Sequence, residues 1–273
     1  AFSALPHKTG VDTISAVLER GIKVVDVSAD FRLKDAKDYE TWYDFTHPMP
    51  QLLSEAVYGL VELNRHQVAS ARLVANPGCY PTGAILALAP AVRENLIEPD
   101  IIIDAKSGVS GAGRGLSLTT HFSEANENTS AYALEGHRHL PEIVQELGRL
   151  NPALSLSVTF VPHLVPMSRG ILTTCYAKLA AGKQIEEIRE LYKEFYRGEP
   201  FVKVVDSPPQ TKQTWGSNLC LIYPAIDKRT GRLIVISCID NLVKGGAGQA
   251  VQNMNLMLGI AEATALDGVA VYP

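Results

Sequence analysis

Cysteine is scarce in this sequence of 273 residues, and long apolar or basic runs are missing. The four cysteines stand at positions 79, 175, 220 and 238, and no two of them form a C-x-x-C pair. This spacing argues against a zinc ribbon and against a disulfide framework, and it favours a reducing compartment. We therefore expect a cytoplasmic protein without a structural metal.

The longest weakly polar stretch covers residues 83–92, far short of the roughly 20 apolar residues that a membrane helix requires. The sequence carries no signal-peptide pattern. Lysine and arginine together number 25 against 29 aspartates and glutamates, and no run of basic residues is present. These features argue against a membrane span and against a nucleic-acid partner.

Hydrophobic residues make up 46% of the chain and charged residues 20%. This composition is typical of a globular protein with a substantial core. Because a domain usually has about 100–200 residues, the length allows one large domain or two ordinary ones.

The first segment alternates strands and helices. Residues 1–5 read as a buried strand, Asp12 can cap a helix that Gly21 ends, and residues 22–27 form the next strand, which together predict a βαβ unit. A short strand over residues 72–75 then leads through a turn into a helix over residues 84–95.

The second half has a different pattern. A strand over residues 101–103 runs into a glycine-rich segment, and residues 154–161 alternate apolar with polar side chains, as in a half-exposed antiparallel sheet. The other expected elements are strands over 170–179, 201–205, 219–223 and 233–239, and helices over 184–197 and 248–265. We therefore expect an α/β part followed by an α+β part.

Cys79 lies where a strand ends and a helix begins. Unpaired amide groups and the helix dipole at such a place stabilise a thiolate, which favours a catalytic nucleophile. The alternative is a small buried side chain. That structural role fits Cys175, Cys220 and Cys238 better, because each lies inside an apolar strand pattern.

Two histidines, His137 and His139, directly precede a helix that Pro141 opens. Either could exchange a proton with a nearby thiol. A surface pair is one alternative, and a metal site formed with His163 is another, although acidic or thiolate ligands at the usual spacing are missing.

Two glycine-rich segments and two arginines could bind a ligand. Residues 108–115 do not match the dinucleotide fingerprint, but their amides could approach an anion or a flat ring, and Arg114 could pair with a carboxylate or a phosphate. Residues 244–249 precede the last helix. They could contact an anion or a cofactor at the helix N-terminus, or they could simply form a turn. Arg169 could bind a carboxylate or lie in an exposed turn.

Six segments in this order resemble the N-acetyl-gamma-glutamyl-phosphate reductase family, a branch of the semialdehyde dehydrogenases. The segments are DVSADFR (26–32), YGLVELN (58–64), NPGCYPT (76–82), SGVSGAGR (107–114), HRHLPE (137–142) and GGAGQAVQNMN (245–255). The resemblance extends over nearly the whole chain.

The resemblance implies a Rossmann-type NADP-binding domain over residues 1–78 and 245–273, and an inserted α+β catalytic and dimerisation domain over residues 79–244. It implies NADPH-dependent reduction of N-acetyl-glutamyl 5-phosphate to the semialdehyde, with release of phosphate, in arginine biosynthesis. The expected assembly is a homodimer or homotetramer that acts on a small-molecule substrate.

The resemblance also implies roles for individual residues. Cys79 is the expected nucleophile and His137 the expected acid/base, with His139 as the alternative. The candidate substrate-binding residues are Arg114, Arg169, His139 and His163. The candidate cofactor-binding residues are Ser107, Gly108, Gly111, Asn241, Lys244, Gly245 and Gly248.

In this family a strand, a glycine-rich turn and a helix that bind the cofactor pyrophosphate precede the segment that matches Ala1. The chain is therefore expected to start inside the Rossmann domain. Three other functions stay open: a reductase of a carrier-linked aminoadipyl phosphate in lysine biosynthesis, a Cys/His acyltransferase or hydrolase without nicotinamide, and a truncated binding module.

Overall fold

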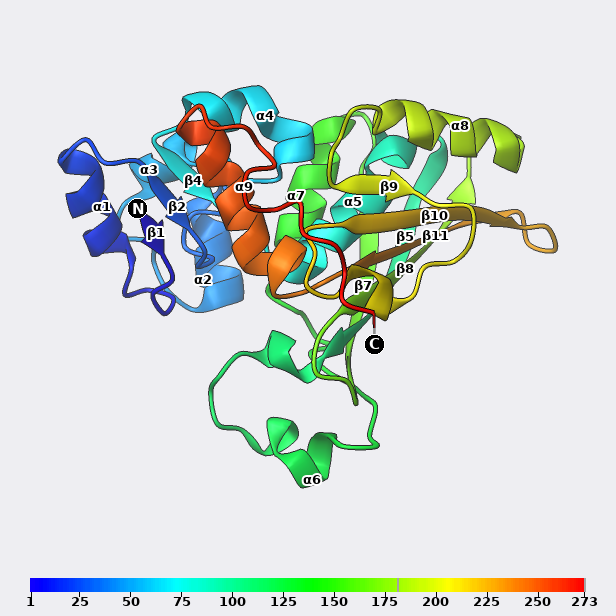
Figure 1. The fold of residues 1–273 in the computed structure, drawn as a ribbon, viewed down its shortest axis with the longest axis horizontal. Coiled ribbons are helices and arrows are strands. Elements are labelled where there is room, and N and C mark those ends of the chain that lie inside the picture. Colours follow the sequence, from blue (N-terminus) through cyan, green and yellow to red (C-terminus); the bar gives the residue numbers. More distant parts are fainter. Residues whose placement is uncertain (181, 273) are drawn as a thin grey trace. The chain divides into compact units, whose positions relative to one another are not determined.

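The computed structural model describes residues 1–180 and 182–272. The chain divides into two compact units, one formed by residues 1–78 with 245–268 and the other by residues 79–244 with the C-terminal residues from Val269 (Figure 1). Each unit contains its own sheet. None of the helices in the described part of the chain is both long enough and apolar enough to cross a membrane.

The first unit contains a four-stranded parallel sheet in the order β1-β2-β4-β3. Its strands are β1 (Phe2–Ser3), β2 (Val24–Asp26), β3 (Val57–Tyr58) and β4 (Leu73–Ala75). Its helices are α1 (Val11–Glu19), α2 (Ala36–Tyr43), α3 (Pro50–Glu55), α4 (Val61–Ser70) and α9 (Gly248–Met257). The parallel pairing of β1 with β2 around α1 confirms the predicted βαβ unit.

The ends of α1 show why its sequence folds in this way. Ile14 and Leu18 point into the core, and Gly21 adopts a φ of 73°, which glycine tolerates without strain. The N-cap is Gly10 rather than the predicted Asp12, which lies in the first turn. Asp12 still favours the helix there, because a carboxylate complements the positive end of the helix dipole.

Two apolar clusters build the core of this unit. One includes Phe31 and Tyr39 beside α1 and α2. The other joins Val25 of the sheet to Val68 of α4 and Met254 of α9. A segment from the end of the chain therefore completes the core of the N-terminal unit.

The second unit contains a seven-stranded mixed sheet in the order β6-β7-β5-β8-β11-β10-β9. Its strands are β5 (Ile97–Gly108), β6 (Ser130–Ala131), β7 (Ser157–Val165), β8 (Ile171–Leu179), β9 (Val202–Val204), β10 (Cys220–Asp227) and β11 (Arg232–Ile239). Its helices are α5 (Cys79–Arg93), α6 (Phe122–Ala125), α7 (Leu140–Leu150) and α8 (Ile185–Phe195), with short helical turns η1 (Val109–Ala112), η2 (Leu118–Thr120) and η3 (Thr211–Thr214). The turn η4 (Val243–Ala247) leads into α9.

The expectation of an antiparallel sheet holds for β5, β8, β11 and β10, whereas β7 lies parallel to β5. The connection from β5 to β7 contains α7, and a long crossover of this kind returns a strand in the same direction. The sheet is therefore mixed, as the family resemblance implies.

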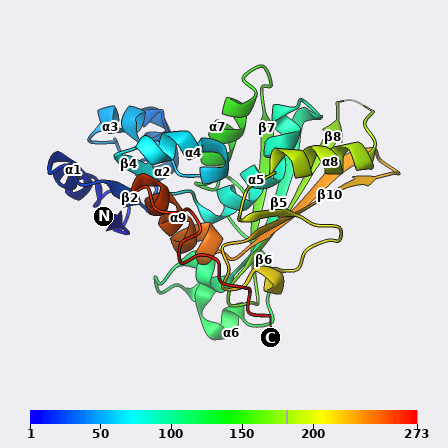
Figure 2. The same ribbon diagram turned by 45° about the horizontal axis from the view of Figure 1, so that its top comes forward.

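Helices α5, α7 and α8 pack on one face of this sheet (Figures 1 and 2). Residues on that face are buried, as Ile101 and Ile103 show, whereas Ile102 between them is 38% exposed. Among the described helices α5 to α8 of this unit, none packs on the opposite face. Between β5 and α7 the chain also makes a long excursion that carries α6 and projects from the end of the sheet (Figure 1).

Candidate active site

Cys79 is the first residue of α5, half-buried at the helix N-terminus. The amide groups of this first turn have no partners within the helix, so they favour a thiolate over a thiol. The helix begins five residues before the predicted start at Ala84. Pro81 belongs to the first turn, where its missing N–H costs nothing.

The backbone before Cys79 is held by Asn76 in the first unit, which has no exposed surface. The Asn76 N–H donates to the carbonyl of Asp26 (2.8 Å), and its side-chain Nδ2 donates to the carbonyl of Gly246 (3.1 Å). Asn76 therefore has a defined position within the first unit.

The other cysteines have a different character. Burial raises the pKa of the Cys238 thiol to about 12 and that of Cys175 further, so both stay protonated near neutral pH. Cys220 is completely buried. These positions support the structural role predicted for all three.

Two tyrosines lie beside Cys79. The Tyr132 hydroxyl donates to the Tyr80 hydroxyl (3.1 Å), which donates to the carbonyl of His163 (3.2 Å). Burial raises the pKa of both hydroxyls, and the nearby charge of Cys79 raises both further. Tyr132 was not among the predicted site residues, because it lies 53 positions from Cys79 in a segment without a motif.

His137 packs against both tyrosines. Its ring centroid lies 5.7 Å from that of Tyr80 and 5.6 Å from that of Tyr132, and the ring of His139 lies 4.8 Å away. Burial and the neighbouring Arg138 lower the pKa of His137 to about 4, so its imidazole is neutral at pH 7. The His139 N–H donates to Nδ1 of His137 (3.0 Å), which assigns the ring proton to Nε2.

The structure therefore brings Cys79, the tyrosine pair and both predicted histidines into one cluster, whereas the ring of His163 contacts a carboxylate. Nδ1 of His163 lies 3.2 Å from Oδ1 of Asp104, and Nζ of Lys106 lies 2.7 Å from the other oxygen of that carboxylate. Within the described residues no group of three or more histidines, cysteines, aspartates and glutamates is arranged to hold a metal ion.

The predicted glycine-rich loop is closely packed against its own chain. The Gly108 N–H donates to the carbonyl of Gly170 (2.9 Å), and a Cβ on Gly108 would lie 2.7 Å from the backbone nitrogen of Arg169. A Cβ on Gly111 would lie 2.5 Å from Oγ of Ser107. Gly108 is required because backbone atoms already fill the space, whereas a side chain at position 111 would displace the Ser107 hydroxyl.

Asn241 joins this loop to the turn that carries Arg169. Its Oδ1 accepts from the Gly170 N–H (2.7 Å), and its Nδ2 donates to Oγ of Ser110 (3.0 Å). Four of the predicted cofactor residues thus lie close together, in a region that we call the cradle: Ser107, Gly108, Gly111 and Asn241.

The two predicted arginines differ. Arg169 forms an ion pair, with its Nη2 2.7 Å from Oδ2 of the fully buried Asp240. Arg114 is exposed on the excursion and makes no hydrogen bond or ion pair among the residues that the structure describes. Only Arg169 is therefore held in a defined orientation.

The remaining cofactor candidates flank the start of α9. Lys244 is fully buried, with its ammonium 5.8 Å from the ring centre of Phe201. Gly245 and Gly248 belong to the first unit, where Gly248 begins α9. The first turn of α9 also holds Gln249, whose buried Oε1 has no hydrogen-bond partner in the described part of the chain.

These features fit a nicotinamide dinucleotide. A parallel sheet binds such a ligand at the carboxyl ends of its strands, and a helix start offers free amide groups to a phosphate. The unpaired Gln249 acceptor is available to an amide or hydroxyl donor of the ligand.

A buried arginine was missed at the sequence level. Arg32 is 6% exposed, its Nε donates to the carbonyl of Asn76 (2.8 Å), and its Nη2 donates to the carbonyl of Val27 (2.9 Å). It places a cation at the carboxyl ends of β2 and β4. The signal was present, because Arg32 ends the segment 26–32, one of the six that carry the family resemblance.

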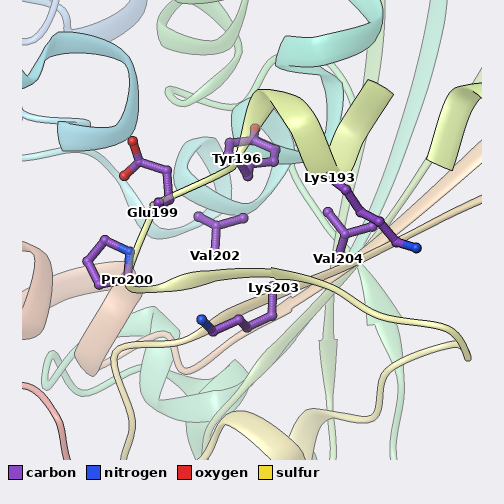
Figure 3. Close-up of a pocket in the computed structure, with 8 residues that line it drawn as sticks. Lys193, Tyr196, Glu199, Pro200, Val202, Lys203 and Val204 are labelled. Carbon is purple, nitrogen blue, oxygen red and sulfur yellow. The ribbon is translucent and has the colours of Figure 1, made fainter. Parts of the chain in front are cut away.

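A cavity of about 360 Å³ lies elsewhere in the second unit, between the end of α8 and β9 (Figure 3). Its lining includes Lys193, Glu199 and Lys203 but none of the predicted site residues. Tyr196, also in the lining, donates its hydroxyl to the carbonyl of Leu86 in the core. The cavity is therefore separate from the cluster around Cys79.

Comparison with protein families agrees with the two-unit arrangement. The model described as "Semialdehyde dehydrogenase, NAD binding domain" matches residues 1–71, and "Semialdehyde dehydrogenase, dimerisation domain" matches residues 79–241. Among solved structures, aspartate semialdehyde dehydrogenase II from Vibrio cholerae has a TM-score of 0.72 at 18% identity, covering 95% of this chain and 79% of that one. This likeness supports the fold.

Relatives of known name are much more similar in sequence. The N-acetyl-gamma-glutamyl-phosphate reductase of Dehalococcoides mccartyi is 60% identical over 273 residues, all of this chain and 80% of that protein. The reductase of the same name from Pelotomaculum thermopropionicum is 56% identical over 275 residues, again all of this chain and 79% of that protein. The chain belongs to the N-acetyl-gamma-glutamyl-phosphate reductases of the semialdehyde dehydrogenase family.

Proposed function

We propose that this chain is an NADPH-dependent reductase that converts N-acetyl-L-glutamyl 5-phosphate to N-acetyl-L-glutamate 5-semialdehyde and phosphate in arginine biosynthesis. The observation that carries the proposal is the identity of 60% with a reductase of this name across the whole chain. The position of Cys79 at the start of α5 supplies the matching chemistry.

Cys79 is the proposed nucleophile. Its thiolate attacks the acyl carbon of the substrate, the C–S bond forms, the C–O bond to phosphate breaks, and inorganic phosphate leaves. The product is a thioester on Cys79, and splitting the reaction in this way makes a resistant acyl group reducible. The amide groups at the start of α5 favour both the thiolate and the oxyanion that forms during attack.

His137 and His139 are the proposed partners for the oxyanion and its proton. The ring of His137 is neutral and carries its proton on Nε2, so it can donate a hydrogen bond to the oxyanion. His139 lies beside it, with ring centroids 4.8 Å apart, and is the second imidazole available for proton transfer.

The proposed cofactor-binding residues belong to the cradle and to the segment that leads into α9. The residues that would hold NADP(H) are Ser107, Gly108, Gly111, Asn241, Lys244, Gly245 and Gly248. When bound, the reduced nicotinamide supplies the hydride that no side chain can provide. In this proposal residues 1–78 and 245–273 form the NADP-binding domain, and residues 79–244 form the catalytic and dimerisation domain.

The substrate has two anionic ends, a carboxylate and an acyl phosphate. We assign the carboxylate to Arg169, whose orientation is fixed by Asp240. Arg114, His139 and His163 stay candidates for other substrate contacts.

A homodimer or homotetramer is the proposed assembly, with the helix-free sheet face as the interface. Strand register places Ile102, Tyr176 and Ile234 side by side on this face. Half-exposed apolar side chains on a sheet are typical of surfaces that another subunit covers.

The direct test is formation of NADPH, followed at 340 nm, from NADP, phosphate and N-acetyl-glutamate semialdehyde. The proposal predicts a rate that depends on phosphate. Activity only with the aminoadipyl analogue would assign the chain to lysine biosynthesis instead. Thioester hydrolysis without nicotinamide would support the acyltransferase or hydrolase.

A further inference from the structure

Asp240 directly follows β11 and is fully buried. Its Oδ2 accepts from the Gly216 N–H (2.7 Å), and its Oδ1 accepts from the Leu242 N–H (2.9 Å). The same Oδ2 lies 2.7 Å from Nη2 of Arg169. Two backbone donors therefore fix the carboxylate, and the carboxylate fixes the guanidinium.

Arg169 is also fixed at its backbone. Its carbonyl accepts from Nε1 of Trp215 (3.0 Å), and the next residue, Gly170, donates its N–H to Oδ1 of Asn241 (2.7 Å). Gly170 has a φ of 104°, a conformation that other residues rarely adopt. The position of this arginine is therefore determined from both ends.

The guanidinium keeps an unused donor. Its Nε is buried and has no hydrogen-bond partner among the described residues, while the side chain as a whole is 33% exposed. A buried N–H without a partner is costly, and an oxygen atom of a ligand would remove that cost. The geometry is that of a site prepared for an anion.

We propose that Asp240 is a positioning residue that makes Arg169 specific for the single carboxylate of the substrate rather than for phosphate. The inference rests on the proposed function. A fixed guanidinium pairs well with a planar carboxylate. The negative charge of Asp240 offsets the positive charge of Arg169. A dianionic phosphate is therefore repelled more than a carboxylate.

The test measures both substrates separately in the phosphate-dependent assay. Asp240→Asn should raise KM for the semialdehyde about tenfold or more, because a charged hydrogen bond is weakened. KM for phosphate and kcat should stay within about twofold. Arg169→Lys keeps the charge but not the planar fork of the guanidinium. It should likewise raise KM for the semialdehyde but not KM for phosphate, and it replaces Asp240→Asn if that variant does not fold.

A double variant tests whether Asp240 acts by positioning Arg169 or by supporting the structure in general. If Asp240 acts through Arg169, Arg169→Gln combined with Asp240→Asn should be no worse than Arg169→Gln alone. The matched control is Asp227→Asn, which removes an ion pair with Arg229 (3.1 Å) whose arginine side chain is 89% exposed. This control should leave both KM values unchanged.

Equal changes in the two KM values, or additive losses in the double variant, would overturn the assignment of Asp240 while leaving the proposed function in place. A folded wild-type chain without phosphate-dependent NADPH formation would overturn the proposed function, and the inference with it.

Discussion

The thiol of Cys79 differs from the other thiols of the chain in its place at the first residue of α5. Cys175 and Cys238 lie inside strands, and burial raises the pKa of both thiols. Under the proposed mechanism, the backbone around each cysteine therefore decides whether its thiol reacts.

Cys79→Ser should lower phosphate-dependent NADPH formation by about three orders of magnitude or more, because a serine hydroxyl at this place is a far weaker nucleophile than a thiolate. The thermal unfolding midpoint should change little, since Cys79 is only half-buried. Cys175→Ala is the control, and its activity per folded molecule should match the wild type. Retained turnover in the serine variant would reject Cys79 as the nucleophile.

His137 should make the stability of the protein depend on pH. Its pKa of about 4 in the folded chain lies below the value near 6.5 of an exposed imidazole. The unfolded chain therefore binds more protons, and this contribution to stability is present above pH 6.5 and lost as the pH falls toward 4.

His137→Gln should accordingly lose less stability than the wild type between pH 6.5 and 4, as chemical denaturation at several pH values would measure. Arg138→Gln, which removes the neighbouring charge that lowers the pKa of His137, should have an intermediate effect. Identical pH profiles for the wild type and His137→Gln would contradict the assigned pKa.

Candidate residues could be proposed from the sequence where a motif is local, but their distant partners could not. Cys79 and His137 were proposed from segments of a few residues, and the structure places them in one cluster. The partner of Arg169 could not be predicted, because Asp240 lies 71 positions away and reaches it only through the fold. The same holds for Tyr132, which bonds to Tyr80 across 52 positions.

At the scale of elements, α9 is attached to the first unit by side-chain amides as well as by apolar contacts. Nδ2 of Asn253 donates to the Gly59 carbonyl (2.8 Å) and to Oδ1 of Asn76 (3.0 Å), and Nε2 of Gln249 donates to the same Gly59 carbonyl (2.8 Å). The backbone of Gly59 approaches α9 so closely that no side chain fits there.

Gly59→Ala should therefore destabilise the protein by about 1–3 kcal/mol or more, the usual cost of overfilling a packed site. The added Cβ would lie 2.4 Å from Nδ2 of Asn253 and 2.7 Å from the side chain of Val74. Denaturant unfolding would measure the loss.

Gly148→Ala is the matched control, because Gly148 lies in α7 and has no atom within 4 Å of an added Cβ. Alanine should stabilise that helix by up to about 1 kcal/mol. Equal effects of the two substitutions would contradict the close packing of Gly59 against α9.

Element boundaries were harder to predict than element types. The strands and helices flanked by glycine and proline were recognised, but α9 ends at Met257 rather than near Ala265. The helices α2, α3 and α4 were missed. Helix α2 lies within residues 31–50, which mix aromatic with polar side chains without a clear period. The aromatic residues of α2 are buried by tertiary packing, as Tyr39 shows.

At the scale of the whole molecule, the two-unit plan was implied by the family resemblance and not by hydrophobic periodicity. Neither the composition nor the spacing of apolar residues indicates that α9 returns to the first unit. That arrangement depends on contacts between residues about 190 positions apart, such as Gln249 with Gly59.

The proposed interface makes a prediction about assembly. Ile102→Glu places a charge on the helix-free sheet face, where Ile102 is 38% exposed. A charge buried between subunits is costly, so this variant should elute as a monomer in size-exclusion chromatography with light scattering. Ile22→Glu, on a residue of the first unit that is 46% exposed, is the control. An unchanged oligomer in Ile102→Glu would place the interface elsewhere.

The central claim is that the reaction passes through a thioester on Cys79. The most direct measurement mixes the protein with NADP and N-acetyl-glutamate semialdehyde without phosphate, and follows NADPH in the first seconds together with the mass of the Cys79 peptide. The account predicts a burst of at most one NADPH per subunit and one N-acetylglutamyl group on that peptide. Added phosphate should release the acyl group as the acyl phosphate, and NADPH should then rise further. Steady turnover without phosphate, or an acyl group on another peptide, would contradict it.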